Sequence, residues 1–350
     1  MARNLRAIAT TSVAVAALGA GVLAASAPAS ADPASGYRPF VGVGSDTTQD
    51  VLNALAGDVT GTTGITTKVA SYNAFGTAQI KVSSTGPTFD RPAGSGAGVK
   101  ALSDSETGTP FNGVNIEGQI DFARSSSGPS ASGTDLTYVP FARDAVSYAY
   151  RGAAGKIGKL TTAQLNAVYS ANTPVTINGV KVTGVLPQSS SGTRKFFLGA
   201  IGVTTVGSTV VQTSSPENDG SILTATNQVV PFSSAQWIAQ KNKVVTDTTG
   251  AALLGAPNNK PAATTNATTG LLQPSAAFYN AAPFGRNVYN VVPTNTIGVT
   301  GKAAALFTGD TAAFCGTKAK AIVKKFGFAL IAASSATPCG STSITGPLTP

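Results

Sequence analysis

The sequence alternates short apolar segments with amphipathic ones, and several apolar segments end in a loop rich in glycine and hydroxyl side chains. Val41–Gly44 precedes a helical pattern with Leu52 and Leu55 on one face. Val182–Leu186 likewise precedes an amphipathic segment. Alternating strands and helices predict an α/β fold with a largely parallel sheet, and such sheets bind ligands at the carboxyl ends of their strands. We therefore expect ligand-binding loops after several strands.

The loop Gln188–Arg194 carries the clearest ligand-binding pattern, because it reads Gln-Ser-Ser-Ser-Gly-Thr-Arg and leads into an apolar helix face. Ser191 is a favourable N-cap, so a helix is expected to begin at Gly192. The N-terminus of a helix has unpaired N–H groups and the positive end of the helix dipole, and Thr193 and Arg194 would lie in its first turn. The segment is therefore a candidate anion site, with an ordinary capped helix as the alternative.

Three more loops repeat this combination of glycine, hydroxyls and a helix or strand end. They are Gly44–Thr47, Gly94–Gly98 and Arg124–Ser127, the last followed by Gly128. The spacing of Asp46 and Gln49 fits a capping box, so Asp46 is expected to be either a helix cap or a carboxylate of the ligand site.

The first 31 residues have the pattern of a secretory signal peptide. A basic start precedes an apolar run over 7–25, and Ala29-Ser30-Ala31 predicts cleavage after Ala31. No Cys lies near this position to carry a lipid anchor, so we expect a freely secreted chain. Without Arg3 and Arg6, 22 basic residues face 15 acidic ones, a net charge near +7. These charges are scattered, so no nucleic-acid partner is expected.

The chain contains no histidine and two cysteines, which limits its chemistry. Without histidine, Ser-His and Cys-His activation and the commonest zinc ligand are absent, so we expect no metal, no cofactor and no enzymatic activity. In an exported chain Cys315 and Cys339 are expected to form one disulfide, with two free thiols as the alternative.

Five motifs stand in the chain in the order that they have in a known family. They are Gly42–Thr47, Gly94–Leu102, Asp121–Ser126, Ser190–Thr193 and Glu217–Gly220. With them the chain resembles the phosphate-binding receptors of ABC uptake systems, which are type 2 periplasmic binding proteins. The resemblance covers nearly the whole mature chain. It implies an α/β fold with two lobes, 37–139 plus 286–350 and 140–285, that are joined by two crossing strands and clamp an anion.

The resemblance also implies which residues bind the ligand, namely hydroxyls and N–H groups of both lobes, with Arg194 pairing with the charge of the anion. The chain departs from the family at Ser126, where the receptors carry Asp, and at Pro187-Gln188, where many carry Arg. Arg124 is expected to help restore the charge, and Asp46 the proton acceptor. The complete predicted set is Ser45, Asp46, Thr47, Ser95, Gly96, Arg124, Ser126, Ser191, Gly192, Thr193 and Arg194.

The leading hypothesis is a secreted, monomeric binding protein for an inorganic oxyanion, with phosphate as the expected ligand and an ABC permease as a partner that the resemblance implies. A site of donors alone suits sulfate, whereas monohydrogen phosphate needs an acceptor, because an unpaired buried O–H costs about 1–3 kcal/mol. Asp46 would therefore decide between the two anions. Two alternatives are a secreted hydrolase or phosphoesterase that uses a serine of the same site, and a cell-surface structural protein that has lost its ligand.

Overall fold

The computed structural model describes residues 32–33, 36–298, 304–309 and 311–349. The predicted signal peptide lies outside these residues. Within them, no helix is both long enough and apolar enough to cross a bilayer.

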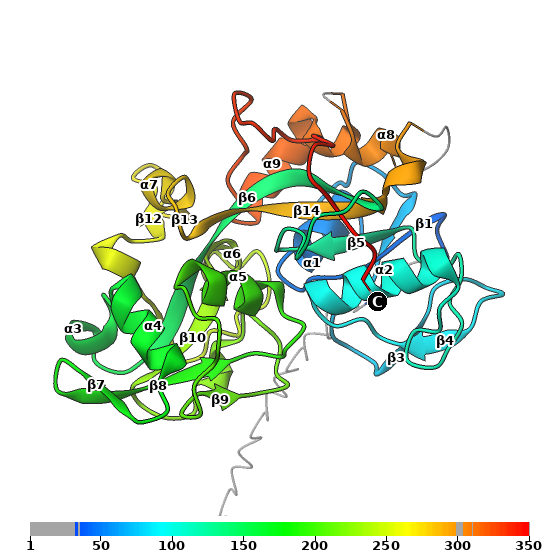
Figure 1. Ribbon diagram of the computed structural model, residues 1–350. Helices are drawn as coiled ribbons and strands as arrows, with labels where there is room; N and C mark the ends of the chain where they lie inside the picture. Colours follow the sequence, from blue (N-terminus) through cyan, green and yellow to red (C-terminus); the bar gives the residue numbers. More distant parts are fainter. Residues whose placement is uncertain (1–31, 34–35, 299–303, 310, 350) are drawn as a thin grey trace, which may run out of the picture. The chain divides into compact units, whose positions relative to one another are not determined.

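The described strands form one large mixed sheet and two separate hairpins (Figure 1). The main path of the sheet runs through β2 (Val69–Ser71), β1 (Phe40–Gly44), β5 (Phe122–Ser125), β14 (Gly285–Pro293), β6 (Leu136–Arg151), β10 (Gln228–Ser233), β8 (Val180–Leu186) and β7 (Val175–Ile177). Beside this path, β11 (Leu253–Leu254) and β15 (Thr345–Gly346) pair with β6, and β9 (Val211–Gln212) pairs with β8. The hairpins are β3 (Gln79–Lys81) with β4 (Thr88–Asp90), and β12 (Ala263–Thr265) with β13 (Leu272–Pro274).

Strands β6 and β14 continue through the middle of the sheet, as predicted for the crossing strands. Residues 136–145 of β6 pair with β14, and residues 146–151 pair with β10. The valine, tyrosine and phenylalanine side chains of β6 suit a strand that is buried along nearly its whole length. Pro140, which has no N–H to donate, lies where the register of the two strands shifts.

Parallel pairing on either side of the crossing strands brings strand ends together. On one side β1 pairs in parallel with β2 and β5, and on the other β8 pairs in parallel with β10 and β9. The helices are α1 (Gln49–Leu55), α2 (Ser95–Thr107), α3 (Ala154–Ile157), α4 (Thr162–Ser170), α5 (Gly192–Ala200), α6 (Ser234–Lys241), α7 (Ala276–Tyr279), α8 (Ala304–Phe307) and α9 (Thr317–Lys325). Single 3₁₀ turns cover Gly220–Ile222, Pro257–Asn259, Thr294–Thr296 and Ala313–Cys315.

The buried apolar side chains separate into clusters along the chain. Two clusters are built mainly from residues before 143 and after 287, and two others mainly from residues 145–284. The division predicted from the sequence is into 37–139 plus 286–350 and 140–285. We keep this division as a proposal and refer to the two parts as lobe one and lobe two.

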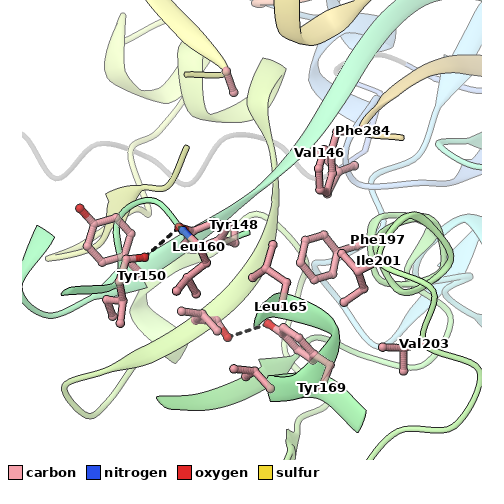
Figure 2. Packing of buried hydrophobic residues seen from close by; sticks show 14 of the residues in the cluster. Val146, Tyr148, Tyr150, Leu160, Leu165, Tyr169, Phe197, Ile201, Val203 and Phe284 are labelled. Carbon is pink, nitrogen blue, oxygen red and sulfur yellow. Dashed lines mark hydrogen bonds between the residues drawn. The ribbon is translucent and has the colours of Figure 1, made fainter. Parts of the chain in front are cut away.

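Helix α5 packs against the rest of lobe two, and this packing fixes the position of the helix's N-terminus (Figure 2). Phe197 is fully buried, and its ring meets that of Tyr169 from α4 edge to face, with centroids 5.4 Å apart. The Tyr169 hydroxyl donates to the carbonyl of Val229 in β10 at 2.8 Å. Burying a side chain such as Phe197 contributes about 1.5–3 kcal/mol, so α5 is held firmly over the sheet.

Several local predictions can be compared directly with the structure. Cys315 and Cys339 form the predicted disulfide. Thr161 and Gln164, which have the sequence spacing of a capping box, form one at the start of α4. The capping box predicted for Asp46 and Gln49 was wrong. Helix α1 has Thr48 at its N-cap, with no hydrogen bond from a capping side chain, while the Gln49 side chain accepts from the N–H of Ala74.

Candidate functional site

The predicted loops lie together at the carboxyl ends of parallel strands. Thr47 follows β1, Ser126 follows β5, and Ser191 lies between β8 and α5. The Thr47 and Thr193 hydroxyls are 3.1 Å apart, so the first loop of lobe one touches the first turn of α5 in lobe two. The fold therefore gathers hydroxyls and helix N–H groups from distant parts of the chain in one buried cluster.

The carboxylate of Glu217 lies at the centre of this cluster and accepts hydrogen bonds from both lobes. Its Oε1 accepts from the Thr47 hydroxyl at 2.8 Å and from the Thr47 N–H at 3.4 Å. Its Oε2 accepts from the Thr193 N–H at 2.9 Å and from the Ser191 hydroxyl. Glu217 is only 4% exposed. An oxyanion, the chain's own, is thus already bound at the N-terminus of α5.

Asp46 lies beside Glu217, and the two carboxyl groups differ in charge. Burial, followed by the charge of Glu217, raises the pKa of Asp46 well above its ordinary value. Burial also raises the pKa of Glu217, but a hydrogen bond with Asp46, the charge of Arg286 and donors of α5 outweigh it, so this pKa is lowered. Of the two carboxyl groups, Glu217 is therefore the one that ionises more readily, and Asp46 the one that keeps a proton more readily.

Arg286 of β14 supplies a buried positive charge at this site. Its Nη2 donates to the Thr193 hydroxyl at 2.9 Å and to Asp144 Oδ2 at 2.8 Å. Its Nε also donates to Asp144, while Nη1 is buried without a partner among the described residues. Asp144 lies on β6, so this ion pair joins the two crossing strands directly behind the first turn of α5.

Ser95 and Ser126 form a second group of hydroxyls close to the same helix. Their hydroxyls are 3.2 Å apart, and the Ser126 N–H donates to Ser95 Oγ at 3.0 Å. A Cβ added at Gly192 would overlap both hydroxyls. The Gly96 N–H donates across the lobes to the Ser190 carbonyl at 3.0 Å. Only a glycine at position 192 permits this approach of the two lobes.

A cavity of about 130 Å³ lies next to this group of hydroxyls. Its lining is mostly small hydroxyl and glycine residues of both lobes, with one cation, Lys195. Burial lowers the pKa of Lys195. The cavity therefore offers a polar space beside the donor cluster.

The two arginines predicted to face the ligand have other partners. All five N–H groups of Arg124 are used: it donates to the carbonyls of residues 42, 44, 45 and 72 and to the Ser71 hydroxyl. Burial lowers the pKa of Arg124 to about 9, so it is still charged at neutral pH. Arg194 donates to the Pro187 carbonyl and to Gln212. This geometry favours a structural role for both, in which they hold the loops in place.

The remaining predicted residue, Ser45, lies at the edge of the cluster. Its hydroxyl is buried and has no partner among the described residues, and its N–H and carbonyl are both tied to Arg124. The prediction omitted Glu217, Asp144 and Arg286. For Asp144 and Arg286, the sequence did offer a signal: each is a charged residue within an otherwise apolar strand.

Taken together, the fold and the site define a two-lobed α/β protein whose buried donors hold the Glu217 carboxylate at a helix N-terminus. Residues 25–309 match the family model described as the PBP superfamily domain, so the chain belongs to the PBP superfamily. The predicted membership of the periplasmic binding proteins is thereby confirmed at the level of the superfamily. No curated protein shows significant sequence similarity to the chain.

Solved structures share this fold at low sequence identity. An ABC-type phosphate transport receptor from Vibrio cholerae is 16% identical with a TM-score of 0.51, and the match covers 83% of this chain and 100% of that one. A putative phosphate ABC transporter substrate-binding protein with bound phosphate from Clostridium perfringens is 15% identical with a TM-score of 0.53, over 84% of this chain and 99% of that one. These likenesses establish the fold.

Replacing Gly192 by alanine is expected to weaken binding of phosphate, the ligand expected from the sequence, roughly tenfold or more, because overpacking costs about 1–3 kcal/mol. The added methyl would overlap the Ser95 and Ser126 hydroxyls and keep the lobes apart. Calorimetric titration measures the change. Gly199→Ala is the matched control, since it lies on the same helix and a Cβ there meets no atom within 4 Å. Equal affinities of the two variants would contradict the prediction.

Proposed function

We propose that this chain is a secreted solute-binding protein that clamps an inorganic oxyanion between its lobes, with phosphate as the expected ligand. One observation carries the proposal: an ionised carboxylate, that of Glu217, is held by two N–H groups and two hydroxyls that come from both lobes. Charge-assisted hydrogen bonds of this kind are the means by which proteins bind phosphate and sulfate. The same donors would serve an anion from solution.

The positive charges around the cluster favour the binding of an anion. Arg286 carries one positive charge into the site, and its Nη1 has a hydrogen to offer. The N-terminus of α5 adds the positive end of its dipole. Asp46 can share a proton with a bound phosphate, so that either the ligand or the carboxyl group carries it. This arrangement supplies the acceptor that a protonated phosphate requires.

The related receptors named above suggest a partner. Both are named as components of ABC-type phosphate transport. We propose by analogy that the closed, anion-bound form of this chain is what a permease would recognise. No enzymatic step is part of the proposal. Ser191 does contact a carboxylate, but the lowered pKa of Glu217 makes that group a weak general base for a serine nucleophile.

The proposal is tested by thermal unfolding and calorimetric titration with phosphate and with sulfate. A ligand that binds the folded state raises the melting temperature. We expect phosphate at millimolar concentration to raise it. If phosphate, sulfate and related oxyanions all leave the melting temperature unchanged and give no titration heat, the proposed function is wrong.

Asp46→Asn is expected to weaken phosphate binding roughly tenfold or more while sulfate binding is retained, because the amide cannot share a proton with the ligand and an unpaired buried O–H costs about 1–3 kcal/mol. Parallel titrations with the two anions check this result. Glu117→Gln, which makes the same carboxyl-to-amide change at an exposed position, serves as the control. Equal losses for phosphate and sulfate, or none for either, would exclude Asp46 as the selecting group.

A further inference from the structure

We infer that Glu217 is a tethered ligand: it occupies the anion site and holds the lobes closed until an oxyanion from solution replaces it. This inference rests on the proposed function. Its starting point is that both oxygens of the Glu217 side chain are already fully used. A ligand that needs the same donors therefore cannot bind while Glu217 stays in place.

The position of Glu217 relative to the lobes makes it a bridge. Glu217 belongs to the loop before β10 in lobe two, while Thr47 belongs to lobe one. One carboxylate oxygen accepts from Thr47, and the other accepts from the first turn of α5 in lobe two. A bound anion that closes a two-lobed binding protein makes the same kind of contact, to one lobe on each side. Glu217 thus bridges the two lobes in the way that a bound anion would.

Charge also makes occupancy by Glu217 and by an external anion mutually exclusive. Arg286 is the cation that hydrogen-bonds to the donor cluster, through the Thr193 hydroxyl, and its charge is already shared with Asp144. A second anion next to an ionised Glu217 would place two negative charges in a buried space, which is strongly unfavourable. An oxyanion that uses these donors therefore has to exchange with Glu217.

The neighbouring residue shows which part of the chain stays fixed during the exchange. The Asn218 carbonyl accepts from Gln240 at 2.9 Å and from Thr248 at 3.2 Å, and its side-chain oxygen accepts from the Ser233 N–H at 2.9 Å. These partners belong to lobe two, while Asn218 Nδ2 also donates to Thr47 Oγ1 at 3.1 Å and to Asp46 Oδ1 at 3.4 Å in lobe one. The exchange thus moves the Glu217 side chain against an anchored main chain, without unfolding the loop.

Internal occupancy has two measurable consequences. The apparent affinity for phosphate equals the intrinsic affinity multiplied by the fraction of molecules in which Glu217 has left the site. The ligand-free protein also stays closed, because closure does not wait for a ligand. Removing the carboxylate reverses both effects: phosphate binds more tightly, and the empty protein opens.

The experiment compares phosphate titrations of the wild type, Glu217→Ala and Glu217→Gln. We expect both variants to bind phosphate roughly tenfold or more tightly than the wild type, since each removes the competing charge. Glu217→Gln keeps the shape of the side chain and guards against a folding defect in Glu217→Ala. Glu117→Gln makes the same change of net charge at an exposed position and is expected to match the wild type.

A second measurement follows closure directly. Small-angle scattering is expected to give a larger radius of gyration for phosphate-free Glu217→Ala than for the wild type, and phosphate should remove the difference. If the wild type binds phosphate and both variants bind equally or more weakly, Glu217 assists the ligand and the inference alone fails. If none of the proteins binds phosphate or sulfate, the proposed function fails together with it.

Discussion

Replacing Asp144 by asparagine is expected to lower the free energy of unfolding by about 3–5 kcal/mol, the cost of leaving one partner of a buried ion pair uncompensated. Asp144 is fully buried and accepts from Arg286 through two nitrogen atoms. It also accepts from the Ser233 hydroxyl and the Ala235 N–H at the start of α6. Loss of its charge therefore affects both crossing strands and this helix. Urea denaturation measures the change.

The control for Asp144 is an exposed ion pair in the same protein. Asp247 pairs with Lys241, and its side chain is 43% exposed. Asp247→Asn keeps the side-chain oxygen that Thr249 uses and removes only the charge. Such pairs contribute less than about 1 kcal/mol. Similar losses for the two variants would mean that the Asp144–Arg286 pair is not the anchor of the crossing strands.

Two hydroxyls, those of Ser191 and Thr47, hold the Glu217 carboxylate. In a protein that lacks the Glu217 carboxylate, removing both hydroxyls is expected to weaken phosphate binding roughly 100-fold or more. In a Glu217→Ala background, Ser191→Ala with Thr47→Val deletes one donor from each lobe. Each hydrogen bond to a charged group contributes about 1.5–3 kcal/mol. With Glu217 present the loss should be clearly smaller, since Glu217 and phosphate lose the same donors. Titration of all four proteins forms a double-mutant cycle.

A second control separates this effect from the loss of a helix cap. Ser191 is the N-cap of α5 and accepts from the Arg194 N–H. Thr161 caps α4 in the same way and lies outside the donor cluster. Thr161→Ala should therefore leave phosphate affinity unchanged while it lowers stability by about 1 kcal/mol. Equal losses of affinity with and without Glu217 would argue against competition for these hydroxyls.

Much of the fold could be predicted because its signals are local. The pattern of Thr161 and Gln164 is complete within four residues, and the helix that it predicts is present. The apolar runs of β6 and β14 are long enough to be recognised as strands from composition alone. The disulfide followed from there being only two cysteines in a chain expected to be exported. Each of these inferences needed only neighbouring residues or a count.

The centre of the candidate site could not be predicted because its contacts join distant residues. Glu217 meets Thr47 across 170 positions, and Arg286 meets Asp144 across 142. No periodic pattern encodes such a pairing. Asp46 shows the opposite error: a local capping pattern was present, but the helix begins later and leaves this carboxyl group beside Glu217. Local rules fail most often where function places charge in a buried site.

The most direct test of the account is a crystal structure determined with saturating phosphate. The account predicts phosphate within hydrogen-bonding distance of the Ser191 hydroxyl and the Thr193 N–H, with the Glu217 carboxylate displaced from both. A structure in which Glu217 still accepts from Ser191, Thr193 and Thr47 at saturating phosphate, with no anion at the N-terminus of α5, would contradict it.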